Sequence, residues 1–437
     1  MTERASIFQN AQIGLETTPG TAVAALKVLG SLMVTMGMQF ETSSYRPSGY
    51  RFKTVVAPNK EWASSKISGP ISYSEIPYLL ESLIKTVTAT TPGGGTDSRS
   101  RVYAPTTKTA DTKKTWTLEQ GDQTRAQRVT NGLVTGLTFN FTRNECTIDG
   151  TLLSKALVDD IHLSTNAQYT LTANASPPTA GDFTLTFGGQ TTSAIAYNAT
   201  AAAVEAALEA LSTVGTGNVE VTRTTGTTTL AEANAVYTVE FVNDLAQAPR
   251  TLTGTFTGLT ASGSIALASS VTGVTPTELE AIPVLPTHIC IYMADAQADL
   301  DAADPLERVL SCSWGYTDVE GALWTLNRDV ASFAVTVPTE PKLEFKIKMA
   351  ADDEGMTPLT NIRAGSTKFF RIEAIGDVIE GAITYELTID IAVKFQTPTE
   401  FADEEGVYAL EWTAEGVHDA TWGKATELTV VNDIASL

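Results

Sequence analysis

WASSKISGPISYSEIPYLLESLIK, from Trp62 to Lys85, is the stretch that decides the fold. Its first half alternates apolar or small residues with polar ones, the period of a half-buried strand: Ile67, Gly69, Ile71 and Tyr73 against Lys66, Ser68 and Ser72. From Ile76 to Ile84 apolar residues recur at helical spacing, after Ser74 as a suitable N-cap and with Pro77 in the first turn. The sequence therefore predicts a strand that runs into a short helix lying back on a sheet.

The same succession recurs in the C-terminal half. Leu343–Met349 alternates in the same way, and Thr357 with Pro358 begins a second short helix. The flanks echo too: WTLEQGD (116–122) matches FRIEAIGD (370–377), and AALKVLGSLMVTMG (24–37) matches ADPLERVLSCSWG (303–315). Four echoes in one order predict an internal duplication, since repeats indicate stacked or ring-like architectures.

The composition excludes several classes of protein. A chain of 437 residues can hold two or three domains, and nothing in its composition is typical of general disorder. The net charge of −21 argues against affinity for nucleic acid, which needs Lys and Arg to neutralise phosphates; the simplest reason for this charge is solubility. There is no signal segment and no apolar run of about 18 residues, so we expect synthesis in the cytoplasm and no membrane span.

No catalytic or metal-binding set is found. His162, His288 and His418 stand alone, and the three cysteines are isolated and expected to be buried thiols. The acidic run Ala294–Glu307 lacks the order of a calcium loop and is interpreted as a solvated loop. We therefore expect no enzyme activity, cofactor or metal.

Two further segments differ from their surroundings. Tyr45–Glu61 is interpreted as a long connection, and it carries four cations on an acidic protein. From about Tyr169 to Thr275 the chain is rich in Thr, Ala, Gly and Ser and poor in Lys and Arg. Its pattern predicts strands and one helix that begins near Thr200 and stops before Gly215, a small α+β module.

At QIGLETTPGTAVAA (12–25) and at EEGVYALEWTAEGVHDATWGKATELTVVND (404–433) the chain resembles the major tail tube proteins of long-tailed bacteriophages, most closely those of phages of actinobacteria. Gly181–Leu211 resembles a repeat of phage and bacterial surface proteins. The resemblance implies a mainly β fold with short helices, made of two tail-tube-type β-sandwich or barrel units and an inserted module. The expected division is an N-terminal arm (1–25), tube unit 1 (26–166), an exterior α+β module (167–275) and tube unit 2 (276–437).

The function implied is that of a structural virion protein, assembled in the host cytoplasm, whose stacked rings form a channel for genome ejection. Its implied partners are other copies of itself, a tape measure protein, a tail terminator and tail-tip or baseplate proteins, while DNA passes through without specific binding. With two units per chain we expect a pseudo-sixfold ring of three chains, with a true hexamer as alternative. A bacterial cell-surface or adhesion protein, a capsid or decoration protein, and an unrecognised hydrolase are rival hypotheses.

Two sets of residues are candidates for these roles. The polar faces of the clearest alternating strands predict that four carboxylates line the channel and repel phosphate: Glu145, Asp149, Glu386 and Asp390. The second set is expected to contact a neighbouring ring or subunit: Arg46, Arg51, Lys53 and Lys60. Its expected acidic partners are Asp352–Glu354 or Asp403–Glu405.

Overall fold

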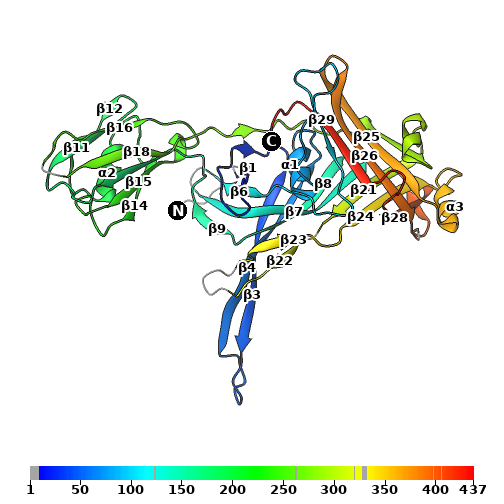
Figure 1. Cartoon of the computed structure of the whole chain (residues 1–437), viewed down its shortest axis with the longest axis horizontal. Coiled ribbons are helices and arrows are strands. Elements are labelled where there is room, and N and C mark those ends of the chain that lie inside the picture. The colour runs from blue at the N-terminus through cyan, green and yellow to red at the C-terminus, as the bar shows by residue number, and fades with distance from the viewer. Residues whose placement is uncertain are drawn as a thin grey trace.

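A computed structural model describes residues 9–122, 125–260, 263–318, 320–326, 332–396, 398–404 and 406–437. The chain is mainly β with short helices, as the sequence predicts. Figure 1 shows a β-rich body, a smaller module joined to it by two linkers, and a long hairpin that projects from the body.

The body is organised around a long antiparallel sheet, here called sheet I. Its members pair in the order β3 (Met33–Tyr45), β4 (Val55–Pro70), β8 (Cys146–Ser154), β7 (Ala126–Thr142), β21 (Val309–Thr317), β24 (Lys342–Ala350), β28 (Val407–Gly416) and β27 (Ala402–Glu404). The first four strands come from the N-terminal half and the last four from the C-terminal half. The pairing of β7 with β21 therefore joins the two halves into one sheet.

Two further sheets complete the body. Sheet II runs β20 (Ile289–Ala294), β25 (Lys368–Glu380), β26 (Ile383–Phe395), β29 (Thr426–Asn432) and β5 (Arg99–Tyr103). Sheet III runs β9 (Val158–Ile161), the first half of β7, β6 (Trp116–Gly121), β1 (Asn10–Leu15), β2 (Lys27–Val28) and β19 (Thr277–Glu278). Because β1 pairs with β6 along its whole length, residues from Asn10 onward belong to the body and do not form a free arm. The part of the expected arm before Gln9 lies outside the described residues.

One hydrophobic core lies between these sheets, and α1 (Ile76–Leu83) is part of it. All eight residues of α1 are buried, and Ser82 Oγ accepts a 2.9 Å hydrogen bond from the Val134 amide of β7. The strand-to-helix prediction for Trp62–Lys85 is confirmed, although Glu75, not Ser74, occupies the N-cap position. The second short helix, α3 (Thr357–Ala364), is also present and ends at Gly365, whose φ of 63° suits glycine.

Strand pairings repeat between the two halves. Six pairings in the N-terminal half have counterparts, in the same chain order, in the C-terminal half. The matches are β1–β6 with β20–β25, β3–β4 with β21–β24, β4–β8 with β24–β28, β6–β7 with β25–β26, β7–β8 with β26–β28, and β7–β9 with β26–β29. All twelve are antiparallel, and a short helix follows β4 in one half and β24 in the other. The strands that correspond include those on which the sequence echoes fall, such as β6 and β25.

The module has its own core, separate from that of the body. One sheet contains β14 (Val219–Thr225), β15 (Val236–Phe241), β10 (Gln168–Ala173) and β18 (Ile265–Val271). The other is built on β11 (Ala180–Phe187), which pairs with β12 (Gln190–Thr191), β13 (Ile195–Ala196), β16 (Leu252–Thr255) and β17 (Leu259–Thr260). Helix α2 (Ala201–Glu209) begins at Thr200, whose side chain caps the Ala203 amide, and it buries Val204 and Leu208.

Candidate assembly surfaces

The face of sheet I that points away from the core is polar and crosses both halves of the chain. Antiparallel register places directly paired residues on one face, so one row runs across six strands: Ser68, Asp149, Thr138, Gly315, Glu344 and Glu415. Neighbouring rows add Thr, Ser and Asn. The charged residues on the strands of this face are Lys66, Lys342, Lys346, Lys348 and Lys394 with Asp149, Glu344, Glu404, Glu411 and Glu415. Five lysines against five carboxylates balance on these strands, so this face is not the acidic wall expected from the net charge.

Glu145 and Asp149 both belong to this side of sheet I. Asp149 is exposed on β8 and accepts a 3.1 Å hydrogen bond from the Asn140 side-chain amide of β7. Glu145 is exposed in the turn between β7 and β8, where its amide donates to Thr142 Oγ1.

Glu386 and Asp390 lie on sheet II, on the opposite side of the core from Asp149. The apolar faces of sheets I and II contribute to one core, so their polar faces point away from each other. The hypothesis that all four carboxylates line one surface is therefore wrong. The strict alternation of β26 identifies its buried face correctly, but it cannot show which sheet the strand joins.

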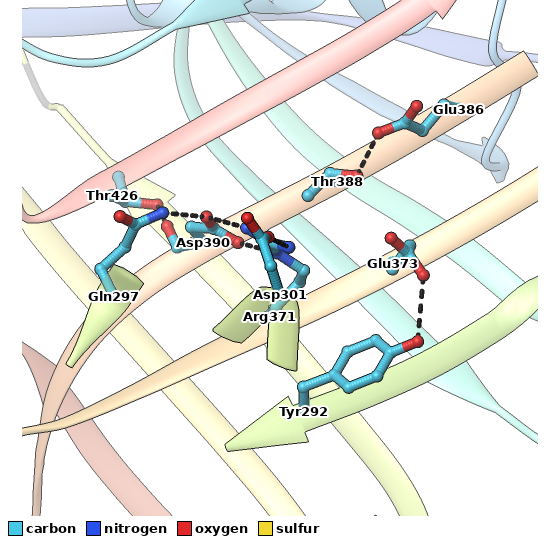
Figure 2. A network of polar contacts seen from close by, with 9 residues as sticks. All are labelled: Tyr292, Gln297, Asp301, Arg371, Glu373, Glu386, Thr388, Asp390 and Thr426. Atoms are coloured by element: carbon cyan, nitrogen blue, oxygen red, sulfur yellow. Dashed lines mark hydrogen bonds and ion pairs between the residues drawn. The ribbon is translucent and has the colours of Figure 1, made fainter. Parts of the chain in front are cut away.

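Asp390 is moreover unavailable as a surface charge. It is 5% exposed and accepts hydrogen bonds from Arg371 Nε at 2.7 Å and Nη2 at 2.9 Å, and from Gln297 at 3.0 Å (Figure 2). These bonds to Asp390 raise the pKa of the Arg371 guanidinium. Glu386 is half-buried and accepts from the Thr388 hydroxyl at 2.6 Å (Figure 2).

The cover over Asp390 comes from the acidic run Ala294–Glu307, where a 3₁₀ segment, η4 (Gln297–Ala302), packs on sheet II. Leu300 is buried against Phe369 and Ala392, and Asp301 pairs with Arg371 (Figure 2). The interpretation of this run as a solvated loop is therefore wrong for η4. Leu300, the one leucine of η4, is the signal that could have predicted the contact with sheet II.

The sequence predicts a long connection at Tyr45–Glu61, but most of this stretch belongs to a strand pair. Strands β3 and β4 pair from Met33–Ser68 as far as Tyr45–Val55, so only the residues between Tyr45 and Val55 form a connection. The distal part of this hairpin, residues 40–61, is here called the arm and is distinct from the N-terminal arm expected from the sequence. It extends beyond the body without a core of its own (Figure 1). Its exposed apolar residues are Phe40, Tyr45, Tyr50, Phe52, Val55 and Val56.

The four predicted contact cations are spread along the arm. Arg46 lies in the connection, where its guanidinium is 3.5 Å from the Tyr50 carbonyl, and Arg51 stacks over the Phe52 ring at 5.6 Å. Lys53 is exposed near the tip. Lys60 is nearer the body and pairs with Glu41 at 2.7 Å. The tip therefore presents alternating aromatic and cationic side chains.

A second, shorter hairpin occupies the equivalent position in the C-terminal half. It pairs β22 (Gly321–Leu323) with β23 (Val335–Val337) and lies in the connection between β21 and β24. Trp324 beside it packs against Trp62 of β4, with ring centroids 5.6 Å apart. Both halves thus extend the corresponding strand pair beyond sheet I.

The predicted acidic partners lie at the other end of the strands of sheet I. Asp352–Glu354 follows the last residue of β24, whereas the register places the first residue of β24, Lys342, toward the arm. Asp403 and Glu404 lie on β27 at the same end as Asp352–Glu354. Arg308 lies 3.6 Å from Asp352, and Lys348 pairs with Glu404. Glu405 lies outside the described residues.

Sheet I ends in two edges. On its outer side β3 pairs with no further strand among the described residues, and a hollow of about 830 Å³ runs beside Leu32–Met36. The Val34 carbonyl accepts a 2.8 Å hydrogen bond from Gln120 across it. At the other edge Val393–Gln396 and Thr399 bond to β28, and β27 pairs with it regularly.

The described part of the chain contains no group of three or more His, Cys, Asp or Glu side chains arranged to hold a metal ion. Within the same residues no helix has the length and apolar character needed to cross a membrane. Cys146 and Cys312 are buried, and burial raises the pKa of the Cys146 thiol to about 11, whereas Cys290 is exposed. Neither a scan against protein-family models nor a search of curated proteins finds a match to this chain.

Proposed function

We propose that this protein is a structural virion protein whose copies close into rings and stack into a phage tail tube, a channel for the genome. The observation that carries the proposal is sheet I: a continuous antiparallel sheet with one polar face, assembled from two halves with the same pairings, and ending in two edges. Exposed edges of such length invite pairing with another chain, and closure into a barrel removes them.

The repeated pairings support an internal duplication. The twelve pairings of the two halves correspond one to one, and the sequence echoes fall on corresponding strands. Each half contributes four strands to sheet I. Three chains of eight strands and six single-unit subunits of four strands both give 24 strands, so a ring of three chains follows from the duplication.

The polar face of sheet I is the proposed channel wall. Sheet I takes four strands from each half and leaves an edge strand at either end, so its closure would produce one continuous inner surface. With its lysines and carboxylates nearly balanced among Thr, Ser and Asn, this wall offers no continuous basic track for phosphates. In this arrangement Glu145 and Asp149 belong to the channel side and Glu386 and Asp390 to the outer side.

Stacking is assigned to the arm. A hairpin with exposed aromatic residues and no core is marginal on its own, so it needs a partner surface. The cations of its tip and the carboxylates of Asp352–Glu354 lie at opposite ends of the strands of sheet I. One chain cannot bring them together, whereas a copy stacked end to end can.

The module is proposed to decorate the exterior. Two linkers hold it to the body, and the first is fixed by hydrogen bonds from the Ser164 amide and hydroxyl to Glu119 at 2.9 and 3.0 Å. His162 lies 3.3 Å from Glu220 and 3.2 Å from Glu240 of the module. These contacts set the module beside the body without entering sheet I.

Negative-stain microscopy of the purified full-length chain, with mass measurement of released rings, tests the proposal. Stacked rings or tubes with a central channel are the expected result. Monodisperse monomers over the whole concentration range would contradict it and favour the cell-surface hypothesis, and closed shells would favour a capsid role.

A further inference from the structure

The joint between the two halves of one chain gives the register of the joint between neighbouring chains. We propose that the edge of β3 in one chain pairs antiparallel with Thr399–Glu404 of the next, so that Gly37 faces Thr399, Thr35 faces Ala402 and Met33 faces Glu404. This inference rests on the proposed ring and specifies which segments of two copies meet.

Corresponding strands supply the first step. Strand β7 is the fourth strand of the N-terminal half, and it pairs with β21, the first strand of the C-terminal half. The first strand of the N-terminal half is β3, because β3–β4 corresponds to β21–β24. The fourth strand of the C-terminal half is formed by Val393–Gln396 and Thr399–Glu404, which lie along β28. A repeat of the β7–β21 joint therefore places β3 of a second copy against this segment.

The register follows from positions that correspond on these strands. The echo that ends at Gly37 and Gly315 aligns β3 with β21, and in both strands the residue before the glycine, Met36 or Trp314, faces the core. Within the chain Gly315 pairs with Thr138 and Ser313 with Asn140. Thr138 and Asn140 in turn pair with Asp149 and Thr147 of β8.

Strand β28 carries the positions that correspond to Asp149 and Thr147. Asp149 and Thr147 pair with two residues of β4, and β24 is the counterpart of β4 in the C-terminal half. The two corresponding residues of β24 pair with Glu411 and Ala409 of β28. Thr399 bonds to Glu411 through its amide and side chain, and Ala402 pairs with Ala409. Gly37 and Thr35 of the next chain consequently face Thr399 and Ala402.

Exposure on both segments agrees with this pairing. Met33 is 74% exposed on β3 and Phe401 is 60% exposed beside β27, both large for apolar side chains at a sheet edge. The hollow along Leu32–Met36 lies at this edge, and a strand added there takes the Val34 carbonyl from the Gln120 side chain that now bonds to it. Thr35 and Ala402 of one chain lie at opposite edges of the eight-stranded sheet. Seven strand spacings of about 4.8 Å separate them by roughly 34 Å, so they cannot be linked within a chain.

A cysteine pair tests the register. Thr35→Cys and Ala402→Cys are combined in a Cys290→Ser background, since Cys146 and Cys312 are buried, and assembled protein is oxidised gently. Directly opposed cross-strand residues have Cβ atoms close enough for a disulfide. The expected product is a ladder of chains on non-reducing gels that ends at the covalently closed ring, and each single variant should give at most dimers.

The matched control is Val102→Cys with Ala402→Cys, because Val102 is exposed on β5 of sheet II and lies away from both the proposed joint and the arm. Rings visible by microscopy with no Thr35–Ala402 ladder, or with an equal ladder from the control, would overturn the register and leave the proposed function standing. If the wild-type chain forms no rings at any concentration, both the register and the proposed function fail.

Discussion

Replacing Phe139 with alanine should weaken the body and leave the module unchanged. Phe139 is fully buried at the joint of the two halves, where it pairs with Trp314 and stacks on its ring at 5.4 Å. Removing a buried phenylalanine costs about 3–5 kcal/mol of unfolding free energy. At about 2 °C per kcal/mol for a large domain, the melting temperature of the body should fall by roughly 6–10 °C.

The chain offers a convenient assay for this difference. All six tryptophans lie outside the stretch 167–275, so tryptophan fluorescence reports on the body alone, while calorimetry follows both cores. Leu208→Ala is the matched control, because Leu208 is fully buried in the module and its loss costs about 2–5 kcal/mol there. Phe139→Ala should lower the temperature of the body transition, which fluorescence reports, and leave the module transition unchanged. Leu208→Ala should lower only the module transition, which calorimetry reports. Equal shifts of both transitions by either variant would refute the separation of the two cores.

Three further predictions concern assembly and the carboxylates. Deleting residues 167–275 and joining the flanks with a short Gly/Ser linker should leave tubes that still assemble, seen by microscopy; a folded, soluble variant that no longer polymerises would contradict an exterior role. Reversing charge at Arg51 and Lys53 together should slow polymerisation, measured by light scattering, and make it more sensitive to salt. The same change at Lys342 and Lys346 is the control. Unchanged assembly of the Arg51/Lys53 variant at low salt would refute the stacking contact. Asp390→Asn should cost about 3–5 kcal/mol by leaving Arg371 without its buried partner, whereas Asp149→Asn, at an exposed position, should change the denaturation midpoint little; equal effects would contradict the placement of these carboxylates.

The local elements of the body are predictable from sequence because their patterns are strong. Trp62–Lys85 changes period from two to 3.6 within a few residues, and the structure has the strand and the helix where this change places them. The start of α2 follows from its N-cap Thr200, whereas the helix already ends at Glu209, before the glycine expected to mark its end. In these segments local propensity and burial agree.

The arm shows why the remainder could not be predicted. Its strands have polar and apolar residues exposed on both faces, so Tyr45–Glu61 lacks the alternation that a half-buried strand displays. Pairing between β3 and β4 holds its distal part in place, and near its base Lys60 lies over the Trp324 ring.

The burial of Asp390 could not be predicted for a different reason. Alternation along β26 shows that one face is buried, but the other face is covered by η4, more than 80 residues earlier in the chain. Contacts between segments so far apart leave no periodic signal. The same holds for the joint of β7 with β21, on which the account of the sheet depends.

The number of chains in one released ring tests the central claim most directly. Native mass spectrometry of rings freed from tubes at low concentration would count them, with the monomer of 46.4 kDa as reference. The duplication and the shared pairing pattern predict three chains and a mass of three monomers. Six chains per ring would contradict the use of each half as one tube unit.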